Sequence, residues 1–83
     1  MPKLFNIYVI WRLDGEWLTT LLQYEDAEQQ RQAMLGWSMR QYVEQAYDAE
    51  YLEESPEYPN PVAAGEPFEC LGVFESADLR WVY

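Results

Sequence analysis

The sequence predicts an α+β fold in which a four-stranded antiparallel sheet carries one long helix packed on one face, in the order ββαββ. Residues near both ends of the chain alternate between apolar and polar side chains, which is typical of strands with one buried face. The middle of the chain repeats apolar residues at helical spacing. Because 83 residues can build one compact core but not two, we expect a single domain over 1–83.

Residues 3–24 are predicted to form a β-hairpin. Every second residue in the first half is apolar, and these residues are Phe5, Ile7, Val9, Trp11 and Leu13. Asp14-Gly15 follows directly, and this dipeptide favours the positive φ angles of a two-residue type I′ turn. We therefore expect residues 16–24 to return as the antiparallel partner strand.

The tryptophans of this hairpin flank the predicted turn. Trp11 and Trp17 are expected to face one another as a cross-strand aromatic pair. Large aromatic side chains also help a short chain to fill its core. The sequence therefore assigns all four tryptophans to the core, namely Trp11, Trp17, Trp37 and Trp81.

A single helix is predicted over 26–52. Glu25 and Asp26 place negative charge where a helix N-terminus favours it. Apolar side chains then recur close to i, i+3, i+4, i+7, at Ala27, Met34, Leu35, Met39, Tyr42, Val43, Ala46 and Tyr47. Gly36 interrupts this stretch at a cost of about 1 kcal/mol relative to Ala, which allows a kink there.

The rest of the chain is predicted as a Pro-rich acidic loop over 53–67 and a second β-hairpin over 68–83. Four prolines lie in the loop, and each removes a backbone donor. Alternation then predicts a third strand up to Glu75, with Glu69 and Glu75 at the two ends of one face. Residues 76–78 are expected to turn, and 79–83 to form a short last strand at an exposed edge of the sheet.

Charge is distributed unevenly along the chain. Fifteen acids and five bases give a net charge of −10. Residues 41–79 hold ten acids and no base, so the net charge is concentrated in that half. Such a charge attracts positively charged partners and repels nucleic acid, so direct DNA or RNA binding is not expected.

The residue types that most enzyme and metal sites use are missing. The chain has no His, and its one Cys, Cys70, lies beside acids that raise a thiol's pKa. Zinc and iron–sulfur centres lack ligands, and phosphate-binding glycine motifs are absent from the sequence. We therefore expect no catalytic residue, no cofactor and no metal site, and a protein that is not an enzyme.

The acids between Glu44 and Glu57 form the candidate binding site. Together with two tyrosines among them, the predicted partner-binding residues are Glu44, Asp48, Glu50, Tyr51, Glu53, Glu54, Glu57 and Tyr58. Three interpretations stay open: a solvated surface that keeps the domain soluble, a calcium site, and a protein surface that engages a basic groove. The calcium interpretation lacks the glycine-containing ligand loop.

Several whole-chain features are similar to those of small acidic inhibitors that bacteriophages encode against host defence, including anti-CRISPR proteins and DNA mimics. The chain has fewer than a hundred residues, no catalytic set, a hairpin–helix–hairpin layout and clustered acids. The resemblance implies a stoichiometric inhibitor that binds a basic nucleic-acid-handling protein, such as a CRISPR effector or another host defence complex. No motif carries it.

An alternative is a small structural or assembly accessory that acts through sheet-edge pairing or homodimerisation. The sequence contains no apolar run of the length that a membrane span needs, and the N-terminal residues make a poor signal peptide. We expect a cytoplasmic protein, in a bacterial host cell if a phage encodes it, without a membrane partner.

Overall fold

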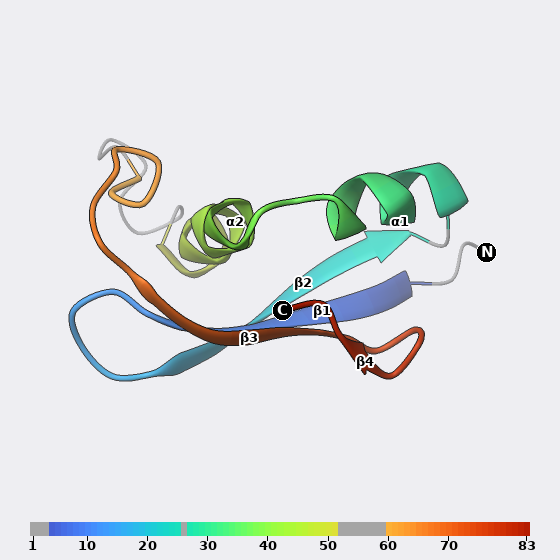
Figure 1. The fold of residues 1–83 in the computed structure, drawn as a ribbon, viewed down its shortest axis with the longest axis horizontal. Coiled ribbons are helices and arrows are strands. Elements are labelled where there is room, and N and C mark those ends of the chain that lie inside the picture. Colours follow the sequence, from blue (N-terminus) through green and yellow to red (C-terminus); the bar gives the residue numbers. More distant parts are fainter. Residues whose placement is uncertain (1–3, 26, 52–59) are drawn as a thin grey trace.

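The computed structural model describes residues 4–25, 27–51 and 60–83. Its elements are β1 (Leu4–Arg12), β2 (Leu18–Glu25), α1 (Glu28–Leu35), α2 (Met39–Tyr51), β3 (Glu69–Glu75) and β4 (Arg80–Trp81). The strands form one antiparallel sheet in the order β2-β1-β3-β4, and both helices lie on the same face of it (Figure 1). The predicted α+β class and four-stranded antiparallel sheet are confirmed, while the element order is ββααββ.

The predicted single helix over 26–52 is wrong, because the chain forms two helices. α1 ends at Gly36, and α2 begins after Ser38. Ser38 and Gln41 form a reciprocal capping box: the Gln41 amide donates to Ser38 Oγ at 3.3 Å, and the Ser38 amide donates to Gln41 Oε1 at 2.7 Å. Gly36, which has low helix propensity, and Ser38, which caps the N-terminus of α2, therefore divide the predicted helix into two. Asp26 lies outside the described residues, and the N-cap of α1 is Ala27.

The first hairpin is confirmed, but its turn and aromatic pair differ from the prediction. The ladder ends at Trp11↔Leu18, so Leu18 rather than Trp17 lies opposite Trp11. Residues 13–17 form a loop in which Asp14 has a φ of 75° and Gly15 does not have a positive φ. A type I′ turn needs positive φ at both central residues, so the prediction of that turn is wrong. The Arg12 guanidinium lies over the Trp17 ring at 4.9 Å instead, which closes the loop by a cation–π contact.

A bulge in β3 changes the side-chain alternation of the second hairpin. Ile10 pairs with Gly72 and Trp11 with Cys70, which leaves Leu71 as the extra residue. Glu69 consequently pairs with Arg12, whereas Glu75 points into the core face, where it is fully buried. The prediction that the two acids share one face is therefore wrong.

The last strand is shorter than the predicted 79–83. β4 comprises only Arg80 and Trp81, and Leu79 takes a φ of 49° in the preceding turn. Val82 and Tyr83 follow the strand and still form backbone hydrogen bonds with Val73 of β3. The chain end is nevertheless fastened, because the Tyr83 hydroxyl donates to the Trp37 carbonyl at 2.5 Å.

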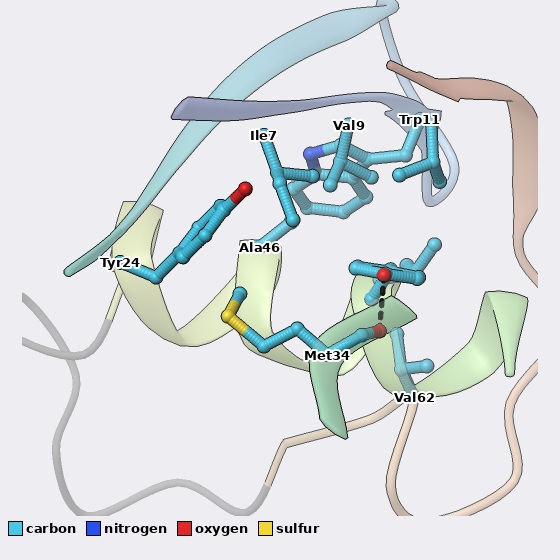
Figure 2. Packing of buried hydrophobic residues seen from close by; sticks show 10 residues of the cluster. Ile7, Val9, Trp11, Tyr24, Met34, Ala46 and Val62 are labelled. Carbon is cyan, nitrogen blue, oxygen red and sulfur yellow. Dashed lines mark hydrogen bonds between the residues drawn. The ribbon is translucent and has the colours of Figure 1, made fainter. Parts of the chain in front are cut away.

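The core lies between the helices and the sheet (Figure 2). Its buried residues are Ile7, Val9, Trp11, Tyr24, Met34, Tyr42, Val43, Ala46, Val62 and Val73. Trp11 is buried and Trp37 half-buried, but Trp17 and Trp81 remain 44% and 61% exposed, so their assignment to the core is wrong. Among the described helices, none has both the length and the apolar character of a membrane span.

Candidate functional site

Four of the eight predicted partner-binding residues lie on α2 in the described structure. These are Glu44, Asp48, Glu50 and Tyr51. The other four, Glu53, Glu54, Glu57 and Tyr58, lie outside the described residues.

Glu44 and Asp48 lie one turn apart, on the side of α2 that contacts the segment beginning at Asn60. The Asn60 side-chain amide donates to the Glu44 carbonyl at 2.8 Å and to Asp48 Oδ1 at 3.0 Å. Asn60 Oδ1 in turn accepts from the backbone amides of Val62 and Ala63, an Asx-type turn that positions buried Val62. Asp48 therefore also serves to fasten this segment to α2.

Glu50 lies on the opposite side of α2, toward the sheet. The buried Trp11 indole Nε1 donates to Thr20 Oγ1 at 2.8 Å, and the Thr20 hydroxyl donates to Glu50 Oε1 at 2.9 Å. This chain satisfies two buried polar groups and leaves the Glu50 carboxylate at the surface. The three described acids of α2 thus lie on two sides of the helix rather than in one patch.

The Tyr51 side chain is half-buried. Its ring packs edge to face on Trp11, with centroids 6.5 Å apart, and lies 4.9 Å from the Tyr47 ring. A hollow of about 360 Å³ opens beside it, lined by Trp11, Leu13, Asp14, Gly15, Glu16, Leu18, Tyr47 and Tyr51. The fold thereby brings two acids of the β1–β2 loop next to the end of α2.

A second hollow, of about 390 Å³, opens at the same end of the molecule. It is lined by Arg12, Leu13, Asp14, Glu66, Pro67, Phe68 and Glu69, so it shares two loop residues with the first hollow. Figure 1 shows the β1–β2 loop, the end of α2 and the segment after residue 60 together at this end. We define the acidic end as the lining residues Asp14, Glu16, Tyr51 and Glu66, together with Glu50, which precedes Tyr51 on α2.

Sequence reasoning missed three members of the acidic end. The sequence pattern assigns Asp14 only to a tight turn, Glu16 only to the start of the return strand and Glu66 only to a loop. Their proximity depends on how the β1–β2 loop meets α2 and β3, which no local pattern encodes. The only signal in the sequence was the presence of two acids around the predicted turn.

Three acids of the second half of the chain are compensated by arginines from elsewhere. Arg12 Nη2 contacts Glu69 Oε1 at 2.6 Å, and Arg31 forms an ion pair with Asp78. Glu75 is bound by Arg31 Nε at 2.7 Å and faces Arg80 Nε at 3.5 Å. Among the described residues, no such ion pair joins an arginine to the carboxylates of α2 or of the acidic end. The described acids without such an ion pair are those of α2, Asp14, Glu16 and Glu66 around the hollows, and Glu25 at the far end of β2.

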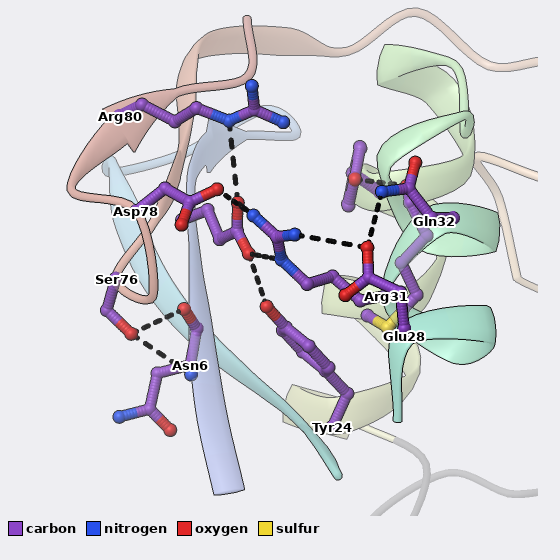
Figure 3. Close-up of polar contacts among 11 residues, drawn as sticks. Asn6, Tyr24, Glu28, Arg31, Gln32, Ser76, Asp78 and Arg80 are labelled. Atoms are coloured by element: carbon purple, nitrogen blue, oxygen red, sulfur yellow. Dashed lines mark hydrogen bonds and ion pairs between the residues drawn. The ribbon is translucent and has the colours of Figure 1, made fainter. Parts of the chain in front are cut away.

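Glu75 is the centre of the largest polar cluster among the described residues (Figure 3). Its side chain is fully buried, and the Tyr24 hydroxyl donates to it alongside Arg31. Burial by itself raises the pKa of Glu75, but the hydrogen bonds from Arg31 and Tyr24 and the nearby positive charges outweigh it and hold the pKa below its usual value. Burial and the Glu75 carboxylate raise the pKa of Tyr24 to about 12. The cluster fastens α1 to the sheet.

We expect this cluster to make stability fall in acid. Because the pKa of Glu75 is lower in the folded than in the unfolded chain, its contribution is complete above the unfolded value of about 4.3 and is lost as pH falls through the folded value. Urea unfolding between pH 7 and pH 3 should show this loss. In the variant Glu75→Gln, the decline over the same range should be smaller, and an equal decline would contradict the assignment.

The chemical groups around the hollows do not form a metal or thiolate centre. In the described part of the chain, no three side chains of the ligating types gather closely enough to hold a metal ion. Burial raises the pKa of the Cys70 thiol, which keeps it protonated at neutral pH. What the site offers is negative charge beside aromatic surface.

Comparison with protein-family models, curated proteins and solved structures finds no match for the chain. Its site residues are therefore assigned from contacts and charges within this chain alone.

Proposed function

We propose that the protein is an anti-CRISPR-like stoichiometric inhibitor. It binds a basic nucleic-acid-handling protein, of the type of a CRISPR effector or another host defence complex, through the acidic end and the acids of α2. Binding blocks the partner's nucleic-acid groove or its activation. The supporting observation is the contrast between Glu69, Glu75 and Asp78, which arginines compensate, and the acids around Tyr51, which have no such ion pair among the described residues.

Physical chemistry favours a basic partner at this end. Carboxylates held on a rigid scaffold can replace the phosphates that a basic groove normally binds, and they steer association over distances of about 8–10 Å at moderate salt. Tyr51 and Tyr47 add half-buried aromatic surface next to the charges, and tyrosine is enriched in protein interfaces. In this proposal the protein works by binding and performs no chemistry.

A structural or assembly accessory is the second candidate. Its support is that β2 is an eight-residue edge strand of the sheet, without Pro or Lys. β4, the edge expected from the sequence, contributes only two residues. The Glu50 carboxylate on Thr20 of β2 places a charge at the longer edge, which disfavours pairing there.

The inhibitor proposal can be tested with two charge reversals at opposite ends of β2. Glu16→Lys lies at the acidic end, in the loop before β2, whereas Glu25→Lys changes an exposed acid at the far end of the strand. With a panel of purified CRISPR effectors, the protein should reduce target-DNA binding in fluorescence anisotropy at a one-to-one ratio. Glu16→Lys should weaken this inhibition by about tenfold, equivalent to about 1.4 kcal/mol, and Glu25→Lys should leave it nearly unchanged.

Salt provides a second criterion in the same assay. Inhibition should weaken steeply between about 50 and 300 mM NaCl, over which the Debye length shortens roughly 2.4-fold, because exposed charges are screened. The proposal is wrong if both reversals have the same effect, if inhibition is insensitive to salt, or if no effector of the panel loses DNA binding.

A further inference from the structure

The sheet face opposite the helices carries a continuous row of apolar side chains across all four strands. Tyr8 of β1 lies opposite Leu21 of β2 and Phe74 of β3, and Phe74 lies opposite Trp81 of β4. The Tyr8 and Phe74 ring centroids are 6.5 Å apart, and those of Phe74 and Trp81 are 5.3 Å apart. We call Leu21, Tyr8, Phe74 and Trp81, together with Ile10 beside them, the open face.

The Trp81 side chain of the open face packs closely on the sheet, although it stays largely exposed to solvent in the described structure. A Cβ atom on Gly72 would lie 2.7 Å from Trp81 Cζ3, so the indole ring rests directly on the glycine backbone. Trp81 nevertheless remains 61% exposed and Leu21 43% exposed. Tyr8, Ile10 and Phe74 between them are half-buried. Exposed apolar side chains that adjoin one another can form an interaction surface, and Trp and Tyr are residues that interfaces favour.

We propose that the open face is the contact surface for a second copy of this chain, stacked sheet against sheet. Stacked sheets lie about 10 Å apart and interdigitate their facing side chains. The strands run along the long axis of the molecule, which measures 34 Å (Figure 1).

The charge distribution favours a second copy at this face. Two chains of net charge −10 repel one another, so they can associate only where that charge is distant or compensated. At one end of the open face, Glu69 is compensated by Arg12, and α2 lies on the far side of the sheet (Figure 1). Asp14 and Glu66 line the same hollow as Arg12 and Glu69, so the two copies must stack with these ends apart. Face-to-face stacking leaves the two α2 helices on the outside, separated by both sheets and so by more than the Debye length of about 8 Å at physiological salt.

Pairing through the β2 edge has the opposite consequence. Glu50 of α2 accepts a hydrogen bond from Thr20 of β2, so this carboxylate lies over the β2 edge. Joining two β2 strands would bring the two Glu50 carboxylates toward each other. The structure therefore favours the open face over the edge.

The dimer is independent of the proposed inhibitor function, although it would display two acidic ends on one particle. Two linked binding surfaces raise overall affinity for a partner that both can reach. A failure of the dimer leaves the charge-reversal test at Glu16 unaffected, so the two proposals fail separately.

Sedimentation equilibrium tests the dimer directly. The wild-type chain of 9.9 kDa should show about twice that mass at micromolar concentrations. Leu21→Lys buries two like charges in the interface and should weaken dimerisation by at least about tenfold, whereas Gln45→Lys, on an exposed position of α2, should leave it unchanged. Circular dichroism melting confirms that each variant is folded, and Trp81→Lys provides a second disruption.

Three results would overturn the proposal. One is a monomeric mass at every concentration, and another is a dimer that both Leu21→Lys and Trp81→Lys leave intact. The third is a dimer in which alternate amides of β2 become protected from hydrogen exchange, since this identifies edge pairing. Association only with a different, added protein would likewise count against a second copy as the occupant.

Discussion

Replacing Glu75 by Gln should lower the free energy of unfolding by about 3 kcal/mol, measured by urea denaturation at pH 7. Glu75 is fully buried and accepts hydrogen bonds from Tyr24 and Arg31. The amide keeps the size of the side chain but removes the negative charge that compensates Arg31 inside the fold. Breaking a buried pair from one side is costly because the remaining charge keeps its desolvation penalty. For a domain of this length, the loss is a large fraction of total stability.

Glu69→Gln is the matched control for this variant. Glu69 also pairs with an arginine, Arg12, but its side chain is 58% exposed and water can replace the lost partner. The expected cost is therefore below about 1 kcal/mol. Similar costs for the two variants would show that burial of Glu75 contributes nothing to the cluster.

Trp11→Ala should destabilise the protein by about 3–5 kcal/mol, the range for deleting a large buried aromatic side chain. The Trp11 ring is 1% exposed and packs edge to face against Tyr47 and Tyr51. Its indole N–H also holds the Thr20 hydroxyl that donates to Glu50. Truncation would leave a cavity and disturb the end of α2 from which the acidic end is built.

Trp17→Ala makes the same substitution at the end of the β1–β2 loop, directly before β2. Trp17 is 44% exposed, and the only contact described for its ring is the cation–π contact with Arg12. The expected loss is about 0.5–1 kcal/mol. Comparable losses for the two tryptophans in thermal or urea unfolding would contradict the observed register and support the cross-strand pair that the sequence suggested.

Local patterns predicted the fold class because each strand and helix has one buried side. Alternation from Phe5 to Leu13 and the helical spacing around Val43 are set by which residues must face the core. The position of the helix break was visible as Gly36, but its completion depends on the capping box between Ser38 and Gln41. The S-x-x-Q spacing of Ser38 and Gln41 is present in the sequence and is typical of a helix N-terminus.

Features that depend on distant residues could not be predicted. The bulge at Leu71 shifts Glu69 and Glu75 to different faces, and only then can each meet its arginine. The sequence showed an acidic half without bases, whereas the fold supplies bases from other segments. The same long-range packing places Asp14 and Glu16 beside Tyr51, so the candidate site contains residues that no local pattern links to α2.

The most direct test of the account is to locate where a positive ligand meets the protein. Backbone amide chemical shifts of the ¹⁵N-labelled chain can be followed by NMR during titration with a deca-arginine peptide at low salt. If the uncompensated carboxylates at the acidic end create a directional negative potential, shifts should concentrate at residues 14–16, 44–51 and 66 and fade as salt is added. Shifts spread evenly over the described residues, or centred on Glu25 and Glu28, would contradict it.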